Sequence, residues 1–307
     1  MQGVLIGFAI IGTIVLIGYI AGRSGVLGPH APFVISRITF FVLSPCLLFT
    51  VLADADVHVL FSKLLAVSVI AALLVIGLYF AIARLIFKRE LPEALIGALS
   101  SGYVNANNIG IPVAVYVLGD PAFSAPVILF QLLVLAPISL TILDAATTGK
   151  ASLGRALLLP LRNPLIIGSA LGALLAITGI ELPEPVMEPF RIIGAAAIPV
   201  VLLGFGMSLH GQRALHPESD RRDVILATTL KLAAMPSLAW VFGSLVFGLT
   251  GLELFAVVML AGLPTAQNIF VYAQRYERGQ VVARDTILLT TIGAVPVLVG
   301  VAAVLAG

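Results

Sequence analysis

Charged residues are scarce in this 307-residue sequence, in which Asp, Glu, Lys and Arg together make up 10%. Soluble domains contain roughly 25% of these residues. Hydrophobic residues account for 60% of the chain, which is more apolar surface than a soluble globule could bury. We therefore expect the lipid bilayer to be the solvent for much of the protein. The net charge of +2 is too small and too dispersed to indicate a nucleic-acid partner.

Cysteine is also nearly absent, because Cys46 is the only one. A single cysteine excludes an internal disulfide framework, and its apolar neighbours predict a packed thiol. The sequence contains no His-Glu-x-x-His, no Gly-x-Ser-x-Gly, no phosphate-binding loop and no cluster of Cys and His. We therefore expect no metal site, no cofactor and no enzymatic activity.

Long apolar stretches make up most of the chain. A helix needs roughly 20 mainly apolar residues to cross the hydrocarbon core of a bilayer. Short loops rich in Gly, Pro and charge separate the stretches. We expect ten spanning helices, at residues 3–22, 33–53, 62–87, 92–119, 122–146, 163–180, 186–209, 223–249, 252–274 and 282–306.

The basic residues indicate how these helices are oriented. Most of the 17 Lys and Arg residues lie in or beside the loops that follow the odd-numbered segments, as Arg84, Lys88 and Arg89 do after the third. Basic loops remain in the cytoplasm. We therefore expect a multi-pass protein of the cytoplasmic (inner) membrane with both termini on the extracytoplasmic side.

Prolines recur at matching places in the two halves of the chain. Three pairs are separated by 154, 152 and 159 residues: Pro45 and Pro199, Pro112 and Pro264, Pro137 and Pro296. Each half would contain five spans, an odd number, so the second half enters the membrane from the opposite side. Such inverted repeats are typical of secondary transporters, whose substrate site lies at mid-membrane between the repeats. For the first and third pairs, a simple kink is an open alternative.

The fourth segment contains Asn105, Asn107 and Asn108 near its midpoint, followed by Gly110 and Pro112. Amides in the middle of a membrane helix are costly unless they face protein, water or a ligand. Proline lacks an N–H and clashes with the carbonyl four residues earlier. We therefore expect the helix to open at Gly110 and to leave the carbonyl of Asn108 without its partner.

The ninth segment repeats this arrangement with Pro264, Thr265, Gln267 and Asn268. Each break would leave the N-terminus of a half-helix inside the membrane, where free N–H groups and a partial positive charge suit a carboxylate. The residues of both breaks together form the predicted substrate site. Two alternatives stay open: the amides and free carbonyls could hold a cation or a water, or the amides could only join helices.

These two motifs resemble those of the auxin efflux carrier family, which includes plant auxin exporters and bacterial malonate-type carriers. The string from Asn105 to Pro112 is similar to the family's Asn-x-x-x-x-Gly-Ile-Pro, and the string from Leu263 to Tyr276 is similar to the bacterial version. The resemblance covers the whole chain in span count, orientation and position of the breaks. The chain lacks the long cytoplasmic loop of many plant members, which favours the bacterial malonate or organic-anion branch.

The resemblance implies an all-α integral membrane fold of two inverted five-helix repeats. Broken helices 4 and 9 would cross, as in bile-acid symporters and sodium–proton antiporters. It further implies a homodimer, with scaffold helices 1–2 and 6–7 in residues 1–57 and 150–210, and mobile transport-domain helices in residues 58–149 and 211–307.

The resemblance also implies roles for two residues. Asn105 would lie at the substrate carboxylate, and the polar residue before the proline of span 2, which is Ser44 here, would contact the substrate. Plant members have Asn at that second place, so the serine argues against the plant substrate.

A coupled transporter needs a titratable group or an ion site. Asp144 closes the fifth segment and Asp285 opens the tenth, whereas Lys231 lies about two turns into the eighth. These three residues are candidates for coupling to H⁺ or Na⁺, although Lys231 can also extend to the membrane surface and Asp144 can simply end a helix. Arg37 falls near the end of its span, so we expect no cationic side chain at mid-membrane and a site that relies on helix dipoles.

The sequence therefore predicts a secondary active transporter for a small organic anion. Malonate or another mono- or dicarboxylate is the expected substrate, with an auxin-like acid as a further candidate. Transport would follow alternating access of the elevator type. The alternatives are an anion channel and an anion-binding membrane sensor of the same fold, and the single internal pseudo-twofold axis favours alternating access over a channel.

Overall fold

The computed structural model describes four stretches of the chain, residues 2–54, 63–148, 162–209 and 221–305. Every named element in these stretches is a helix. The only β-type pairing among them is an isolated antiparallel bridge between Val104 and Thr265. The predicted all-α class is therefore confirmed for this part of the chain.

Within the four described stretches, seven helices are long and apolar enough to cross a membrane: Ile6–Ser24, Ala31–Ala53, Lys63–Leu85, Pro121–Thr147, Glu184–Ser208, Arg221–Val246 and Gln280–Leu305. Three further apolar helices are shorter: Ala106–Leu118, Pro164–Thr178 and Gly251–Ala261. The shorter helices fall within the fourth, sixth and ninth predicted segments. The chain is thus a multi-pass membrane protein, as its composition predicted, and the count of ten passes stays a prediction.

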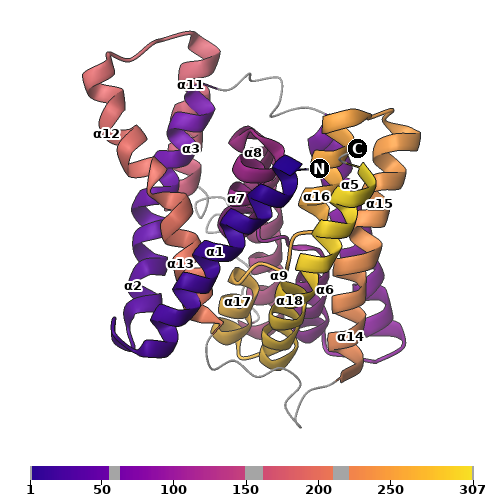
Figure 1. Cartoon of the computed structure of the whole chain (residues 1–307). Helices are drawn as coiled ribbons and strands as arrows, with labels where there is room; N and C mark the ends of the chain where they lie inside the picture. The colour runs from indigo at the N-terminus through magenta and orange to yellow at the C-terminus, as the bar shows by residue number, and fades with distance from the viewer. Residues whose placement is uncertain (1, 55–62, 149–161, 210–220, 306–307) are drawn as a thin grey trace.

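The first helix group lies on one side of the molecule (left in Figure 1). It consists of α1 (Gln2–Ser24), α2 (Ala31–Ile38), α3 (Ser44–Ala53), α11 (Pro164–Thr178), α12 (Glu184–Ala195) and α13 (Ala197–Ser208). Helix α1 packs along α13, and α3 packs against α11 and α12. The backbones approach closely, because a Cβ on Gly206 would clash with the carbonyl oxygen of Val15. Small residues commonly allow such contacts between membrane helices.

The second helix group makes up the rest of the molecule (centre and right in Figure 1). It consists of α5 (Lys63–Leu85), α6 (Leu91–Gly102), α7 (Ile111–Val113), α8 (Ala125–Phe130), α9 (Ala136–Thr148), α14 (Arg221–Thr229), α15 (Met235–Val241), α16 (Gly251–Ala261), α17 (Asn268–Tyr276) and α18 (Gln280–Leu305). Helix α6 packs against α5, α14 and α18, and α16 packs against α5, α15 and α18. The domain boundaries predicted at 57/58, 149/150 and 210/211 lie outside the described residues.

Several prolines lie two residues after the end of a wide, π-helical segment of five residues. These segments are Thr39–Leu43 before Pro45, Ala106–Gly110 before Pro112, Gln131–Leu135 before Pro137, and Leu230–Ala234 before Pro236. A proline has no N–H and its ring clashes with the carbonyl one turn earlier, and a wider turn relieves both problems. Pro199 and Pro296 instead lie within α-helix. The two partners of the first and third proline pairs therefore differ in local geometry.

Hydrogen bonds to Asp223 connect the start of α14 to its neighbours. The carboxylate of Asp223 accepts hydrogen bonds from the Tyr79 hydroxyl at 2.9 Å and from Nη2 of Arg89 at 2.7 Å. Asp223 is 3% exposed, so this buried ion pair ties α14 to α5 and to the turn before α6. The start of α1 and the end of α18 lie at the opposite end of the molecule (top in Figure 1).

Candidate functional site

Two interrupted helices meet near the centre of the molecule. Helix α6 ends at Gly102 and the next helical segment begins at Ala106, while α16 ends at Ala261 and α17 begins at Asn268. The two non-helical stretches, residues 103–105 and 262–267, meet at the isolated antiparallel bridge between Val104 and Thr265, and we call this meeting point the crossing. The Asn105 N–H donates to the carbonyl of Pro264 at 2.8 Å, and the Ala266 N–H donates to the carbonyl of Tyr103 at 3.0 Å.

The first interruption lies earlier in the chain than we expected. The backbone leaves the helix at Tyr103, whose ψ angle of 108° is extended, and returns to helix after Asn105. The expected opening at Gly110 is wrong, because the helix continues through Gly110 and Pro112 to Leu118. The π-helical turn before Pro112 accommodates the missing N–H without breaking the helix.

Side chains from neighbouring helices satisfy the backbone of the crossing. The amide of Gln131 accepts from the Val104 N–H at 2.7 Å and donates to the Val104 carbonyl at 3.1 Å. The Thr265 hydroxyl donates to the Ser100 carbonyl at 2.6 Å, and the Thr265 N–H donates to the Thr290 hydroxyl at 3.1 Å. All of these groups are buried, where an unpaired backbone group would be costly. The crossing is therefore held in one conformation before any substrate binds.

Sequence reasoning missed Gln131. Its side chain is 5% exposed and lies in a stretch of Leu and Phe residues. A lone amide inside an apolar span was the available signal, because polar groups within membrane helices are retained only where they have partners. The identity of the partner, Val104, depends on the tertiary fold.

The two half-helices that follow the crossing begin with free donors. Oδ1 of Asn105 caps the first by accepting from the Asn108 N–H at 3.2 Å, and Nδ2 of Asn107 donates to Oδ1 of Asn108 at 2.9 Å. Within the described residues, the N–H groups of Asn107 and Asn268 have no acceptor. Oδ1 of Asn107 is likewise buried without a donor there, so the site also offers one acceptor.

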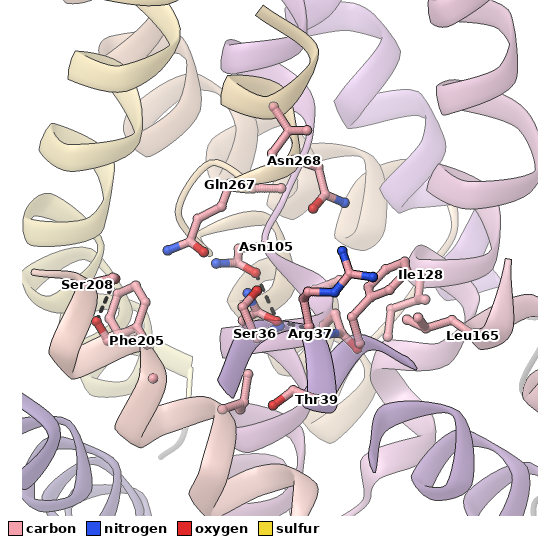
Figure 2. A pocket seen from close by; sticks show the side chains of 18 of the residues that line it. Ser36, Arg37, Thr39, Asn105, Ile128, Leu165, Phe205, Ser208, Gln267 and Asn268 are labelled. Carbon is pink, nitrogen blue, oxygen red and sulfur yellow. Dashed lines mark hydrogen bonds between the residues drawn. The ribbon is translucent and has the colours of Figure 1, made fainter. Parts of the chain in front are cut away.

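A cavity of about 400 Å³ lies at these half-helix starts (Figure 2). Five predicted site residues line it, namely Asn105, Asn107, Asn108, Gln267 and Asn268. The opposite wall comes from the first helix group, from Pro32 to Phe41 and from Val201 to Ser208. The cavity therefore lies between the two helix groups and reaches the ends of α2 and α13.

Arg37 is the second residue that sequence reasoning missed. It lines the cavity together with Ser36 and Thr39, and Figure 2 shows its guanidinium directed into the space near Asn268. The expectation of no cationic side chain at mid-membrane stays a prediction, but the predicted site residues share their cavity with the cationic side chain of Arg37. Its position near the end of a span suggested a surface arginine, and the residue is indeed exposed, but it also lies on the cavity wall.

The other predicted site residues do not line the cavity. Gly110 and Pro112 are buried within the helix behind it, and Pro264 and Thr265 form the bridge of the crossing. Ser44 is 2% exposed and lies outside the cavity wall. This turn of the chain packs on α11, since a Cβ on Gly168 would clash with the backbone of Pro45.

The three coupling candidates also lie outside the cavity wall. Nζ of Lys231 is fully buried and donates to the carbonyl of Ala261, the last residue of α16, at 2.7 Å. Asp144 accepts from the Tyr276 hydroxyl at 2.7 Å and so connects α9 to α17. Asp285 is fully buried and accepts from Nε of Arg284 at 2.8 Å. No group of three His, Cys, Asp or Glu side chains that could hold a metal ion occurs in the part of the chain that the structure describes.

The sequence was compared with known families and proteins. The sequence model of a family described as "Membrane transport protein" matches residues 4–152 and 149–301. A protein of Rhizobium meliloti (strain 1021) named "Putative malonate transporter" is 26% identical over 297 residues, which cover 94% of this chain and 91% of that protein. The predicted resemblance is thereby confirmed. Because the family matches extend over nearly the whole chain, it belongs to this family of membrane transport proteins, that of the auxin efflux carriers, and is a transporter and not an enzyme.

Proposed function

We propose that this chain is a secondary active transporter that moves a small carboxylate across the cytoplasmic membrane by alternating access. The observation that carries the proposal is the cavity at the crossing, where two half-helices begin with free donors. Helix N-termini are suited to anions because unpaired N–H groups and the helix dipole act together.

The chemistry of the cavity wall favours an anion over a cation. In the described part of the chain, no Asp or Glu lines the cavity. The N–H groups of Asn107 and Asn268 lack acceptors, and no described residue accepts from the side-chain nitrogen of Asn105, Asn108 or Gln267. A carboxylate accepts several hydrogen bonds at once, and such charge-assisted bonds are stronger than neutral ones.

The size of the cavity and the name of the related protein both indicate the substrate class. A volume of about 400 Å³ is at the small end of the range for ligand sites, roughly 300–1,000 Å³. The relative from Rhizobium meliloti is named for malonate, which has two carboxylates on one carbon. We therefore propose malonate or a similarly small mono- or dicarboxylate, and rank an auxin-like acid lower.

For the transport cycle we propose ten passes in two inverted repeats, with the second helix group moving against the first in the manner of an elevator. The cavity wall contributed by α2 and α13 includes Pro32, close to the loop after α1, and Ser208, the last residue of α13, and the basic residues of the sequence predict that these ends face the cytoplasm. The present arrangement would then be the cytoplasm-facing state. A homodimer, as the resemblance implies, is checked by light scattering on the detergent-solubilised protein.

Among the coupling candidates we favour Lys231. Its ammonium group holds the last carbonyl of α16, so a change in its protonation would act directly on the crossing. Asp144 and Asp285 remain candidates for a coupled H⁺ or Na⁺. Gradient dependence of uptake in Lys231→Met, Asp144→Asn and Asp285→Asn variants distinguishes them, because only the coupling residue links flux to the imposed gradient.

Uptake into proteoliposomes tests the function. Labelled malonate, succinate, lactate, pyruvate and indole-acetate are supplied with and without imposed proton and sodium gradients. We expect saturable uptake of a small carboxylate, stimulated by unlabelled substrate on the far side of the membrane. Such stimulation is characteristic of alternating access and is not given by a channel.

The Asn105→Ala variant tests the site. It removes a donor to the carboxylate, and hydrogen bonds to charged groups contribute about 1.5–3 kcal/mol, so we expect about a 10- to 100-fold loss of apparent affinity. Gln274→Ala is the matched control, since Gln274 is an exposed amide on α17 that does not line the cavity. Normal uptake by a folded Asn105→Ala protein would disprove the site. Binding of an acid without any flux would favour the sensor.

A further inference from the structure

The charge of the cavity wall is unbalanced. Among the residues that the structure describes, Arg37 is the only charged one that lines the cavity, and none of them that lines it is Asp or Glu. The ion pairs of the described residues involve Arg89, Arg191, Arg278 and Arg284, and none of them includes Arg37. Arg37 is an exposed residue that lines the cavity, so an anion that enters the cavity meets a cation that takes part in none of these ion pairs.

The guanidinium of Arg37 is held between two aromatic rings. Its central carbon lies 5.6 Å from the ring centroid of Phe33 and 5.0 Å from that of Phe41. Phe33, Arg37 and Phe41 are spaced by four residues and so share one face of the helix. Cation–π contacts leave the edge of the guanidinium and its N–H donors free. These donors can bind a carboxylate with two parallel hydrogen bonds.

The second anion-binding element of the cavity is of a different kind. Asn105, Gln267 and Asn268 present amides and half-helix ends, which provide partial charges but no full charge. They belong to the crossing in the second helix group, whereas Arg37 belongs to α2 in the first. Figure 2 shows these amides and the Arg37 guanidinium directed into the same space.

We propose that Arg37 is the specificity-determining residue of the substrate site and selects dicarboxylates over monocarboxylates. One carboxylate of the substrate binds to the amides and half-helix ends of the crossing, and the other binds to the guanidinium of Arg37. A monocarboxylate leaves one of these two elements empty. This inference rests on the proposed transport of small carboxylates and narrows their class.

The location of Arg37 in the first helix group also implies that the selection acts on one face of the membrane. The dicarboxylate would connect the first helix group to the second only while the two groups are arranged as they are here. Movement of the second group would separate the crossing from Arg37, so the selection for two carboxylates acts on the face of the membrane to which this arrangement opens.

The test compares malonate with its monomethyl ester, which has nearly the same shape and one carboxylate fewer. Apparent affinities are measured by uptake into proteoliposomes at a pH at which both carboxyl groups of malonate are ionised. For Arg37→Gln we expect about a 10- to 100-fold loss of affinity for malonate, because a charge-assisted bond is removed. For the ester we expect a change of less than about threefold, so the preference for malonate disappears.

Two further variants keep the test decisive. Arg37→Lys retains the charge but not the paired donors, so we expect a smaller loss for malonate and again little change for the ester. Arg23→Gln removes an exposed arginine at the end of α1 that does not line the cavity, and we expect both affinities to stay as in the wild type. Size-exclusion profiles show whether each variant is folded. If Arg37→Gln does not fold, Arg37→Lys takes its place in the comparison.

Two results would overturn the inference. Equal losses for malonate and the ester would make Arg37 a general attractor of anions, and unchanged affinities would remove it from the site. Both results leave the proposed function intact as long as Asn105→Ala weakens the apparent affinity for malonate and for its ester. Absence of any carboxylate uptake by the wild type would instead disprove the proposed function itself.

Discussion

Replacement of Gln131 should destabilise the crossing on which the substrate site is built. Its side chain pairs with both backbone groups of Val104, at 2.7 and 3.1 Å, and Val104 immediately precedes Asn105. In Gln131→Leu both backbone groups of Val104, a residue that is 2% exposed, lose these partners. We therefore expect the protein to be less stable and Asn105 to be displaced.

The magnitude follows from these two bonds. A buried polar group left without a partner costs about 1–3 kcal/mol, so two such groups cost about 2–6 kcal/mol. This is a large share of the roughly 5–15 kcal/mol by which folded proteins exceed their unfolded states. In Gln131→Glu one acceptor is retained, but a carboxylate oxygen faces the Val104 carbonyl and a charge is buried, so we expect a loss at least as large.

Thermal unfolding in detergent and the apparent affinity for the transported acid are the assays. Gln274→Leu is the matched control, because Gln274 is exposed and the described residues form no hydrogen bond with its side chain. We expect a Tm several degrees below that of the wild type for both Gln131 variants, with weakened uptake. A Gln131→Leu protein that has the same Tm as the wild type and binds substrate normally would refute the reasoning.

Two further predictions concern packing at a distance from the site. Asp223→Ala removes the carboxylate to which Arg89 donates, and we expect about 1–3 kcal/mol less stability, below the cost for a fully buried pair because the Arg89 side chain is 30% exposed. A Tm equal to that of the wild type would show that the pair contributes nothing. Gly206→Ala places a Cβ against the carbonyl oxygen of Val15, and we expect it to lower the stability by about 1–3 kcal/mol because α1 must move away from α13. Gly12→Ala is the control and should not lower the Tm, since no atom lies within 4 Å of the added Cβ. Equal effects of the two substitutions would contradict the close contact between the helices.

Class and helix positions were predictable from the sequence for a physical reason. In lipid, every backbone group of a spanning segment must be satisfied internally, so a long apolar run has few structural choices other than a helix. The same constraint made the two polar breaks visible, because Asn105 and Gln267 lie where a membrane helix otherwise has no amides. The residues that line the cavity on the side of the crossing were named in this way.

The exact position of the first break was not predictable. Pro112 indicated an interruption, but a proline can be accommodated either by opening the helix or by widening one turn. The structure widens the turn at Ala106–Gly110 and opens the chain at Tyr103–Asn105 instead. The opening occurs where Gln131 and Pro264 can satisfy the freed backbone groups, and their positions depend on long-range packing.

The opposite wall of the site was decided by tertiary structure alone. Arg37 and Ser44 lie on neighbouring turns of one segment, and their side-chain chemistry does not tell which of them faces the crossing. The contact between α3 and α11 buries Ser44 in a packed interface, and Arg37 instead lies on the cavity wall, on a helix that packs against α13. The sequence by itself determined a helical membrane protein with two polar breaks, because solvation in lipid acts on each segment separately. Which side chains meet across the cavity was decided only by the packing of the two helix groups, because that contact joins residues far apart in the chain.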